Sequence, residues 1–157
     1  MPKYDRWNTA EAEEIVRSRA GERGATLPMF HDLMERFGYV DRAIVPFVAE
    51  ITNLSRAEIH GTLTFYHDFR DHAPGRTTLK VCRAEACQSR GGAAMYEALK
   101  RKLGVDWHGT TPDGAITIEP VYCLGLCACA PALLADDRPV GNIDLDILDE
   151  VIAEARA

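Results

Sequence analysis

Four cysteines form two close pairs in this 157-residue sequence. Cys82 and Cys87 are separated by four residues, and Cys123 and Cys127 by three, with a long gap between the pairs. Paired thiols at such spacings are typical of a chain that wraps structural zinc or an iron–sulfur cluster. The spacing alone leaves both metals open. A thioredoxin-like dithiol is less favoured, because its redox spacing is C-x-x-C.

The fifth cysteine and the histidines offer two alternatives to these four cysteines as metal ligands. Cys129 lies two residues beyond Cys127 and would also close a loop with Cys123, as C-x5-C. A Rieske-type site, in which two histidines replace two cysteines, needs histidines near the cysteines. No histidine pairs with a cysteine at close ligand spacing, so surface or capping roles are expected for all five. These are His31, His60, His67, His72 and His108.

Composition restricts the class of protein. The chain is 46% hydrophobic, which is enough to build a sizeable core without disulfides. The 27% of charged residues and the net charge of −6 favour a soluble protein that does not bind nucleic acid. The N-terminus lacks an apolar signal region, and the uncharged stretch from Pro120 to Ala135 is too short to cross a membrane. We therefore expect a cytoplasmic protein, where clustered cysteines more often bind metal than form disulfides.

The first half of the chain predicts four short helices that pack together. Residues 9–20 form the first, with Thr9 as N-cap, and residues 27–37 the second, ended by Gly38. The third starts near Val45-Pro46. Ser55 and Glu58 form a capping box before the fourth, whose apolar face carries Ile59, Leu63 and Tyr66.

A break at residues 72–76 then separates this part from an extended pattern. The expected domains are residues 1–75 and residues 76–157. The second is expected to contain, in order, strand 77–81, helix 88–103, strand 115–122, short strands 132–135 and 138–140, and a helix from Asp144. The predicted helical stripes are Met95, Leu99 and Leu103, then Leu145, Leu148, Ile152 and Ala155. This β-α-β-β-α order is the thioredoxin-like arrangement, so the expected fold class is α+β.

Both cysteine pairs follow predicted strands, where loops build sites on α/β sheets. A helix that begins near Gln88 would direct free backbone N–H groups at the first loop, and Arg83 and Arg90 add positive charge there. Whether these arginines act on a metal centre or are simply solvated stays open. Leu124 and Leu126 are available to exclude water from the second loop. A [2Fe–2S] cluster needs two ligands for each iron, which two separated pairs supply.

The sequence resembles the thioredoxin-like [2Fe–2S] ferredoxin family, the 24 kDa-type subunit of NADH:quinone oxidoreductase and its relatives. The resemblance covers nearly the whole chain. Its motifs are Gly61-Thr62-Leu63-Thr64-Phe65-Tyr66, Val81-Cys82 with Cys87, Cys123-Leu124-Gly125-Leu126-Cys127 with Ala130-Pro131, and Gly141-Asn142. It implies that Cys82, Cys87, Cys123 and Cys127 ligate the cluster, with Cys129 a small buried residue nearby.

The resemblance also implies a function. The phrases FYHDF and CLGLCACAP are most like the gamma subunit of NAD-dependent formate dehydrogenase. A chain of this kind exchanges single electrons with the FMN of an NAD(H)-binding flavoprotein subunit, while a larger iron–sulfur and molybdenum subunit performs formate chemistry. The equivalent subunit of NADH:quinone oxidoreductase or of a bidirectional hydrogenase diaphorase is the alternative. A zinc-stabilised interaction module is the non-redox alternative.

The helical part has two further interpretations. Phe65 and Tyr66 are expected to pack in the core of the helices rather than to line a docking face. The helical domain as a whole is expected to dock the partner, because it precedes a hinge-like break and is not needed to form the cysteine site.

Overall fold

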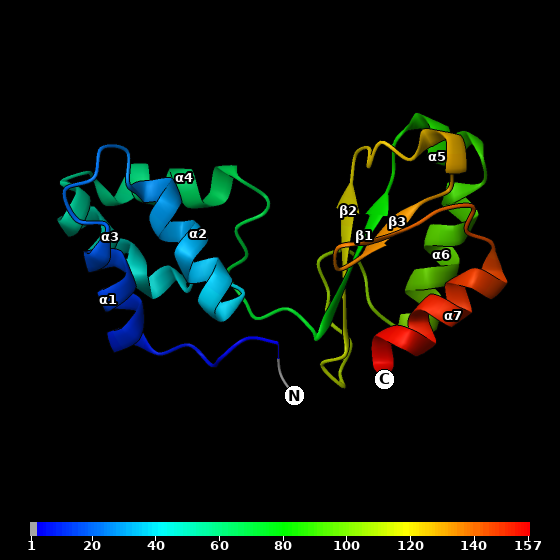
Figure 1. Ribbon diagram of the computed structural model, residues 1–157, viewed down its shortest axis with the longest axis horizontal. Coiled ribbons are helices and arrows are strands. Elements are labelled where there is room, and N and C mark those ends of the chain that lie inside the picture. The colour runs from blue at the N-terminus through cyan, green and yellow to red at the C-terminus, as the bar shows by residue number, and fades with distance from the viewer. Residues whose placement is uncertain (1–2) are drawn as a thin grey trace. The chain divides into compact units, whose positions relative to one another are not determined.

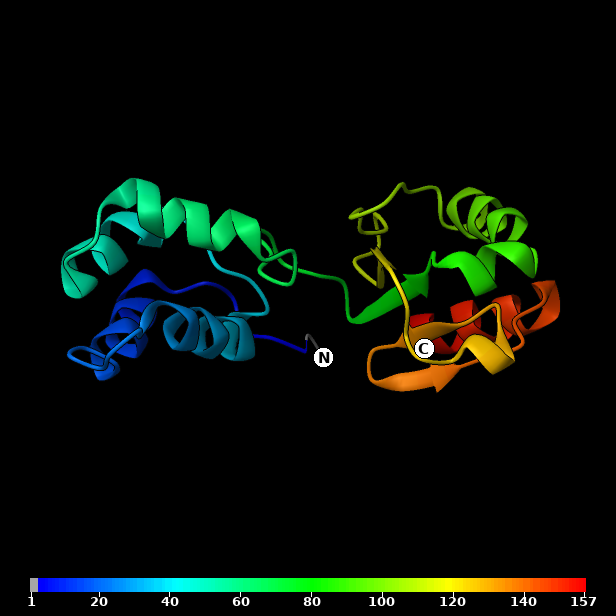
Figure 2. The same cartoon turned by 90° about the horizontal axis from the view of Figure 1, so that it is seen from above.

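The computed structural model describes residues 3–157 (Figure 1). The chain divides into two compact units, Met1–Ala73 and Pro74–Ala157, and each has a hydrophobic core of its own. The first unit is helical, and the second contains the sheet (Figures 1 and 2). The predicted α+β class, with four N-terminal helices before a unit that contains the sheet, is confirmed. The second unit has one strand and one α-helix more than the predicted β-α-β-β-α order.

The N-terminal unit consists of four α-helices and one short 3₁₀ turn that the sequence pattern does not reveal. Their bounds are α1 Thr9–Ser18, α2 Thr26–Phe37, η1 Arg42–Ile44, α3 Val45–Thr52 and α4 Arg56–Phe65. The side chain of Asn8, not of Thr9, caps α1 by accepting a hydrogen bond from the Glu11 amide. The capping box of Ser55 and Glu58 at the start of α4 is confirmed.

The apolar faces of these helices meet in one core. Met29, Leu33 and Phe37 of α2 are completely buried. Ile59 of α4 is also completely buried, and Leu63 nearly so. The fully or nearly fully buried residues of this core include Val16, Met29, Phe30, Leu33, Phe37, Ile44, Val48, Ile59 and Leu63.

The expectation that Phe65 and Tyr66 pack in this core is wrong. Phe65 is 73% exposed and Tyr66 43% exposed. The reason is that α4 ends at Phe65 and the chain is extended at Tyr66, so neither side chain lies on the helical face that buries Leu63. The two rings stack edge to face on each other, and Tyr66 contacts Phe69 in the same way.

The C-terminal unit is built on a four-stranded sheet. Its elements are β1 Thr77–Cys82, α5 Glu85–Ser89, α6 Gly92–Leu103, β2 Ile116–Val121, η2 Cys127–Cys129, β3 Leu133–Ala135, β4 Arg138–Val140 and α7 Leu145–Arg156. The strand order is β2-β1-β3-β4. β1 pairs with β2 in parallel and with β3 antiparallel, and β3 pairs antiparallel with β4.

Two helices replace the single helix predicted over residues 88–103. α5 begins at Glu85 and α6 at Gly92, with Gly91 between them in the left-handed conformation. A Cβ on Gly92 would lie 2.5 Å from both the Cys87 carbonyl oxygen and the Tyr96 hydroxyl. The close approach of α5 to α6 therefore needs glycine at this position, and it moves Cys87 from the predicted loop into a short helix.

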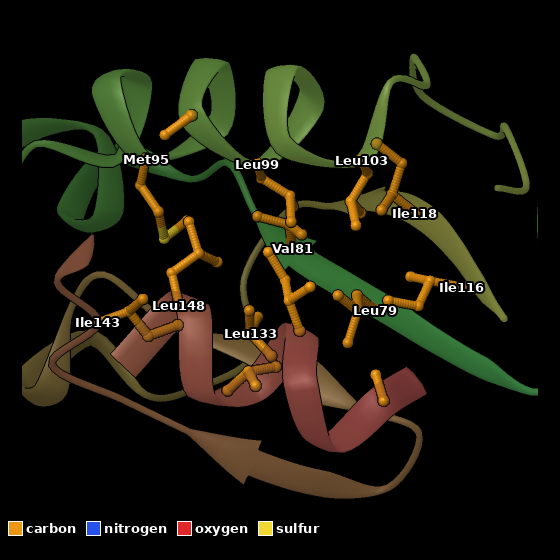
Figure 3. Close-up of a cluster of buried hydrophobic side chains, with 14 of the residues drawn as sticks. Leu79, Val81, Met95, Leu99, Leu103, Ile116, Ile118, Leu133, Ile143 and Leu148 are labelled. Carbon is orange, nitrogen blue, oxygen red and sulfur yellow. The ribbon is translucent and has the colours of Figure 1, made fainter. Parts of the chain in front are cut away.

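α6 and α7 pack on one face of this sheet through side chains from β1, β2 and β3 (Figure 3). The stripe Met95, Leu99 and Leu103 is buried as predicted. On α7, Leu145 is 55% exposed and Val151 is buried instead, because the buried face of the helix starts at Leu148. Thr117 of β2 is fully buried, and its hydroxyl accepts a hydrogen bond from the Gly75 amide.

Within the described residues, no helix has the length and apolar character needed to span a membrane.

Candidate metal centre

The parallel pairing of β1 and β2 brings the two cysteine loops together. Cys82, the last residue of β1, is in register with Val121, the last residue of β2. The Arg83 amide donates a hydrogen bond of 2.7 Å to the Val121 carbonyl, which extends the pairing one residue beyond the strand. Cys123 follows two residues after Val121, so the sheet itself places the second pair beside the first.

The first pair is buried. Cys82 and Cys87 are almost inaccessible and pack with Ala130 and Ala132. The Cys82 amide donates to the Ala132 carbonyl at 3.1 Å, which ties this loop to the chain after the second pair. Each thiol of the pair shifts the pKa of the other, lowering that of Cys82 and raising that of Cys87.

The second pair lies in a tight, exposed loop. Cys123 has a positive φ of 105°, and Gly125 one of 77°. This turn directs the Gly125 amide at the Cys123 Sγ, with a separation of 3.4 Å. The Sγ atoms of Cys123 and Cys127 are 3.7 Å apart. Two thiolates about 2.3 Å from one tetrahedral metal are about 3.8 Å apart, so this pair already has the spacing of two ligands on one metal ion.

Backbone amides of the second loop reach the first pair. Burial alone would raise the pKa of Cys82, but hydrogen bonds from the amides of Ala84, Leu124 and Cys123 and from the Cys87 thiol outweigh it and lower that pKa. Burial, followed by the nearby Cys82 and Cys127 thiols, raises the pKa of Cys87. The pKa of Cys127 is raised by its hydrogen bond with Cys123 and by repulsion between their charges. All four thiols therefore interact within one site, where a metal would keep them deprotonated.

A shallow hollow opens between the two loops. Its lining is apolar apart from sulfur and consists of Cys82, Ala84, Ala86, Cys87, Leu124, Leu126, Cys127 and Ala132. Leu124 and Leu126 are both half-buried, as expected for side chains that shield the second loop. Within residues 3–157 this lining includes no histidine, and all five histidines are exposed.

Cys129 differs from the prediction of a small buried residue: it is exposed. The 3₁₀ turn η2 carries the chain past Cys127, and the Cys129 carbonyl accepts a hydrogen bond of 2.6 Å from the Asn142 amide. A Cβ on Gly141 would lie 2.7 Å from the Cys129 Cβ. Cys129 is thus held against Gly141-Asn142, and it does not line the hollow.

Tyr96 is the residue of this site that sequence reasoning missed. Its buried hydroxyl donates a hydrogen bond of 2.6 Å to the Cys82 carbonyl, so α6 supports the first cysteine loop directly. Burial, with smaller contributions from the Cys87 and Cys82 thiols, raises the pKa of Tyr96 to about 12 and keeps this donor protonated. The available signal was its position three residues before Leu99, which places an aromatic hydroxyl on the buried face of the helix.

Known proteins share the sequence pattern of this chain. The sequence model of the thioredoxin-like [2Fe–2S] ferredoxin family matches residues 12–156. The chain belongs to this family. The resemblance that the cysteine motifs indicated is therefore confirmed, and the family's cofactor is a [2Fe–2S] cluster.

Individual relatives of this ferredoxin-family chain are subunits of larger enzymes. It is 28% identical over 144 residues to the NADP-reducing hydrogenase subunit HndA of Solidesulfovibrio fructosivorans, a match that covers 92% of this chain and 84% of that protein. It is 31% identical over 147 residues to an NADH-quinone oxidoreductase subunit of Rhizobium meliloti (strain 1021), with 94% and 88% covered. A solved NAD⁺-reducing [NiFe]-hydrogenase in the air-oxidised state shares its fold, with a TM-score of 0.68 at 24% identity. That likeness covers 83% of this chain and 22% of the hydrogenase chain.

The residues of this family member fit a [2Fe–2S] cluster. Four thiols occur as two pairs on adjacent strand ends, which matches two ligands for each of two irons. Amide groups point at sulfur in both loops, and such hydrogen bonds stabilise thiolates and cluster sulfides.

Proposed function

We propose that this chain is an electron-transfer subunit whose one [2Fe–2S] cluster is held by Cys82, Cys87, Cys123 and Cys127. The observation that carries the proposal is the meeting of two thiol pairs at the parallel ends of β1 and β2 in a chain of this family. The 3.7 Å separation of the Cys123 and Cys127 sulfurs supports Cys127, rather than Cys129, as the fourth ligand. When bound, the cluster accepts and releases one electron at a time.

The chain's own residues have three tasks in this role. The cysteines hold the metal as thiolates, and the amides of Ala84, Leu124 and Gly125 donate hydrogen bonds to their sulfurs. The apolar lining limits the access of water to the first pair. The second loop remains exposed, which leaves a short path for an electron to enter or leave the cluster.

The partner in this proposal is an NAD(H)-binding flavoprotein subunit, whose FMN exchanges electrons with this chain. The curated relatives support an NAD(P)-linked complex, since they are named as subunits of an NADP-reducing hydrogenase and of NADH-quinone oxidoreductases. Within this class we favour a cytoplasmic NAD-dependent formate dehydrogenase with a larger iron–sulfur and molybdenum subunit. The support is the resemblance of FYHDF and CLGLCACAP to its gamma subunit. The respiratory and hydrogenase complexes fit the relatives equally well. The identities of the subunits that co-purify with the natural protein decide among the three.

Metal content and spectra test the electron-transfer role. The anaerobically purified protein should be brown, bleach with dithionite, and then give a rhombic EPR signal typical of a reduced [2Fe–2S] cluster. A colourless protein that contains stoichiometric zinc, and that stays colourless after reconstitution with iron and sulfide, would replace this proposal with a zinc-stabilised interaction module.

The division of the chain at residues 1–75 and 76–157 is part of the same proposal. We assign cluster binding to the second domain and partner docking to the first. The exposed, edge-stacked rings of Phe65 and Tyr66 support the docking role, because aromatic side chains are enriched at protein interfaces. Substitution of Phe65 by alanine should then weaken co-purification of the flavoprotein without changing the cluster spectrum.

A further inference from the structure

The side chain of Arg83, the residue after Cys82, is held between two aromatic rings. Its guanidinium carbon lies 5.7 Å from the centre of the Tyr96 ring and 5.1 Å from that of the Trp107 ring. The two rings are themselves in edge contact, with centroids 6.0 Å apart. α6 and the loop before β2 thus fix the position of this cation next to the first cysteine pair.

Among residues 3–157, no carboxylate neutralises this cation. The Nε of Arg83 is buried and has no hydrogen-bond partner there, and Arg83 forms no ion pair with any of these residues. A carboxylate partner would cancel the charge, whereas the face of an aromatic ring stabilises it through a quadrupole and leaves the net charge in place. The site therefore keeps one full positive charge in a half-buried position.

Tyr96 connects this charge to the thiols. The Arg83 guanidinium packs against the Tyr96 ring, and the Tyr96 hydroxyl donates a hydrogen bond of 2.6 Å to the Cys82 carbonyl. Arg83 also follows Cys82 directly in the sequence, so its guanidinium is held against the same ring whose hydroxyl contacts the Cys82 backbone.

We propose that Arg83 sets the reduction potential of the cluster by supplying an unneutralised positive charge beside Cys82 and Cys87. This inference rests on the proposed function. Reduction adds one electron to a centre that four thiolates already make negative, and no bond forms or breaks in the chain. A fixed cation stabilises the more negative, reduced form, so Arg83 raises the potential. Arg90 is exposed, and water screens its charge.

Redox titration of the full-length protein tests this role, followed by visible absorbance and by EPR. Arg83→Gln removes the charge but keeps a polar side chain, and Arg83→Lys keeps the charge but replaces the planar guanidinium with an ammonium group. Arg90→Gln is the matched control, since it removes an equal charge from an exposed position near Cys87. All four proteins are compared at the same pH and salt concentration.

Arg83→Gln should lower the ratio of reduced to oxidised protein at least about threefold at a fixed potential, a downward shift of about 28 mV for a one-electron couple. Arg83→Lys should restore most of this ratio, and Arg90→Gln should leave it unchanged. Equal shifts in Arg83→Gln and Arg83→Lys, or no shift in either, would overturn the proposal. So would a shift in Arg90→Gln as large as that in Arg83→Gln.

A second variant serves if Arg83→Gln does not assemble the cluster. Trp107→Leu removes one aromatic wall and lets the guanidinium reach water, so it should also lower the ratio, while an unchanged ratio would contradict the proposal. Failure of the proposed function looks different: the unmodified protein would itself load no iron and sulfide. A brown, reducible protein whose potential does not depend on Arg83 would refute this inference alone.

Discussion

Cys127 and Cys129 lie two residues apart in one loop, but the fold gives them different surroundings. The Cys127 sulfur faces Cys123 at 3.7 Å and lines the hollow between the cysteine loops. Cys129 is exposed, and its backbone is held by Asn142. The difference arises from the turn η2, which rotates the chain between the two residues.

This difference predicts unequal effects of two serine substitutions. Cys127→Ser removes a thiolate that the proposed cluster needs, so iron and sulfide per chain should fall by more than half, with altered visible absorption. Cys129→Ser is the matched control and should keep both at the level of the unmodified protein. Iron and sulfide analysis of the two purified variants measures this. Loss of the cluster in Cys129→Ser with retention in Cys127→Ser would assign the ligand to Cys129 instead.

At this scale the sequence indicated two cysteine pairs as one candidate site, because C-x4-C and C-x3-C are local patterns at predicted strand ends, while the choice of Cys127 over Cys129 came from the family resemblance. They did not predict the exposure of Cys129 or of Phe65, which depends on where a short helix or turn ends. They also missed the contact between Tyr96 and Cys82, which are fourteen residues apart in the sequence. Such contacts depend on the tertiary approach of α6 to the end of β1.

At the scale of elements, the junction between α5 and α6 positions the first cysteine pair. The sequence pattern predicted one continuous helix, since residues 92–103 have a clear apolar stripe and glycine does not by itself end a helix. The structure separates the two helices at Gly91 and packs Gly92 against the Cys87 carbonyl. Only the tertiary packing reveals that Gly92 has no room for a side chain.

Gly92→Ala should therefore destabilise the cluster unit. The added Cβ would lie 2.5 Å from the Cys87 carbonyl oxygen, which belongs to the backbone and cannot rotate away. We expect a loss of about 1–3 kcal/mol in the free energy of unfolding, with less iron bound per chain. Thermal unfolding and iron analysis measure both effects.

Gly61→Ala in α4 is the control for this substitution, because a Cβ there meets no atom within 4 Å. Alanine favours helix by about 1 kcal/mol over glycine, so this variant should be as stable as the unmodified protein or more so. Equal destabilisation by Gly92→Ala and Gly61→Ala would show that close packing at Gly92 is not the cause.

The capping box at the start of α4 predicts a dependence of stability on pH. Hydrogen bonds from the Ser55 hydroxyl and amide to the Glu58 carboxylate, 2.7 and 2.8 Å long, lower the pKa of Glu58. Because the folded pKa is the lower one, the contribution of Glu58 to stability is present above the unfolded value of about 4.3 and is lost as the pH falls through the folded value.

Glu58→Gln should consequently unfold at a lower temperature than the unmodified protein at pH 7, and this gap in unfolding temperature should be smaller at pH 3. Thermal unfolding followed by circular dichroism at the two pH values measures the gap. Glu50→Gln provides a comparison, since Glu50 is exposed on α3 and lies outside the capping box. A gap that is the same at both pH values would mean that ionised Glu58 does not stabilise the cap.

At the scale of the whole molecule, two units with separate cores divide the proposed tasks. The first core consists of buried residues from the N-terminal helices, and the second of buried residues from the sheet, α6 and α7. All four proposed ligands and their supporting residue Tyr96 belong to the second unit. The expected boundary at residues 72–76 rests on a change from helical to extended periodicity, which is visible in the sequence itself.

A fragment of residues 74–157 should therefore bind the cluster by itself, with the absorption and EPR spectra of the full chain. It should not co-purify with the flavoprotein, because the proposed docking surface at Phe65 and Tyr66 is absent. The complementary fragment, residues 1–73, should capture the flavoprotein without binding iron. Capture of the flavoprotein by residues 74–157 alone would place docking on the cluster unit, next to the exposed loop of Cys123 and Cys127. A fragment that folds yet binds no iron would show that the cluster site needs the N-terminal helices.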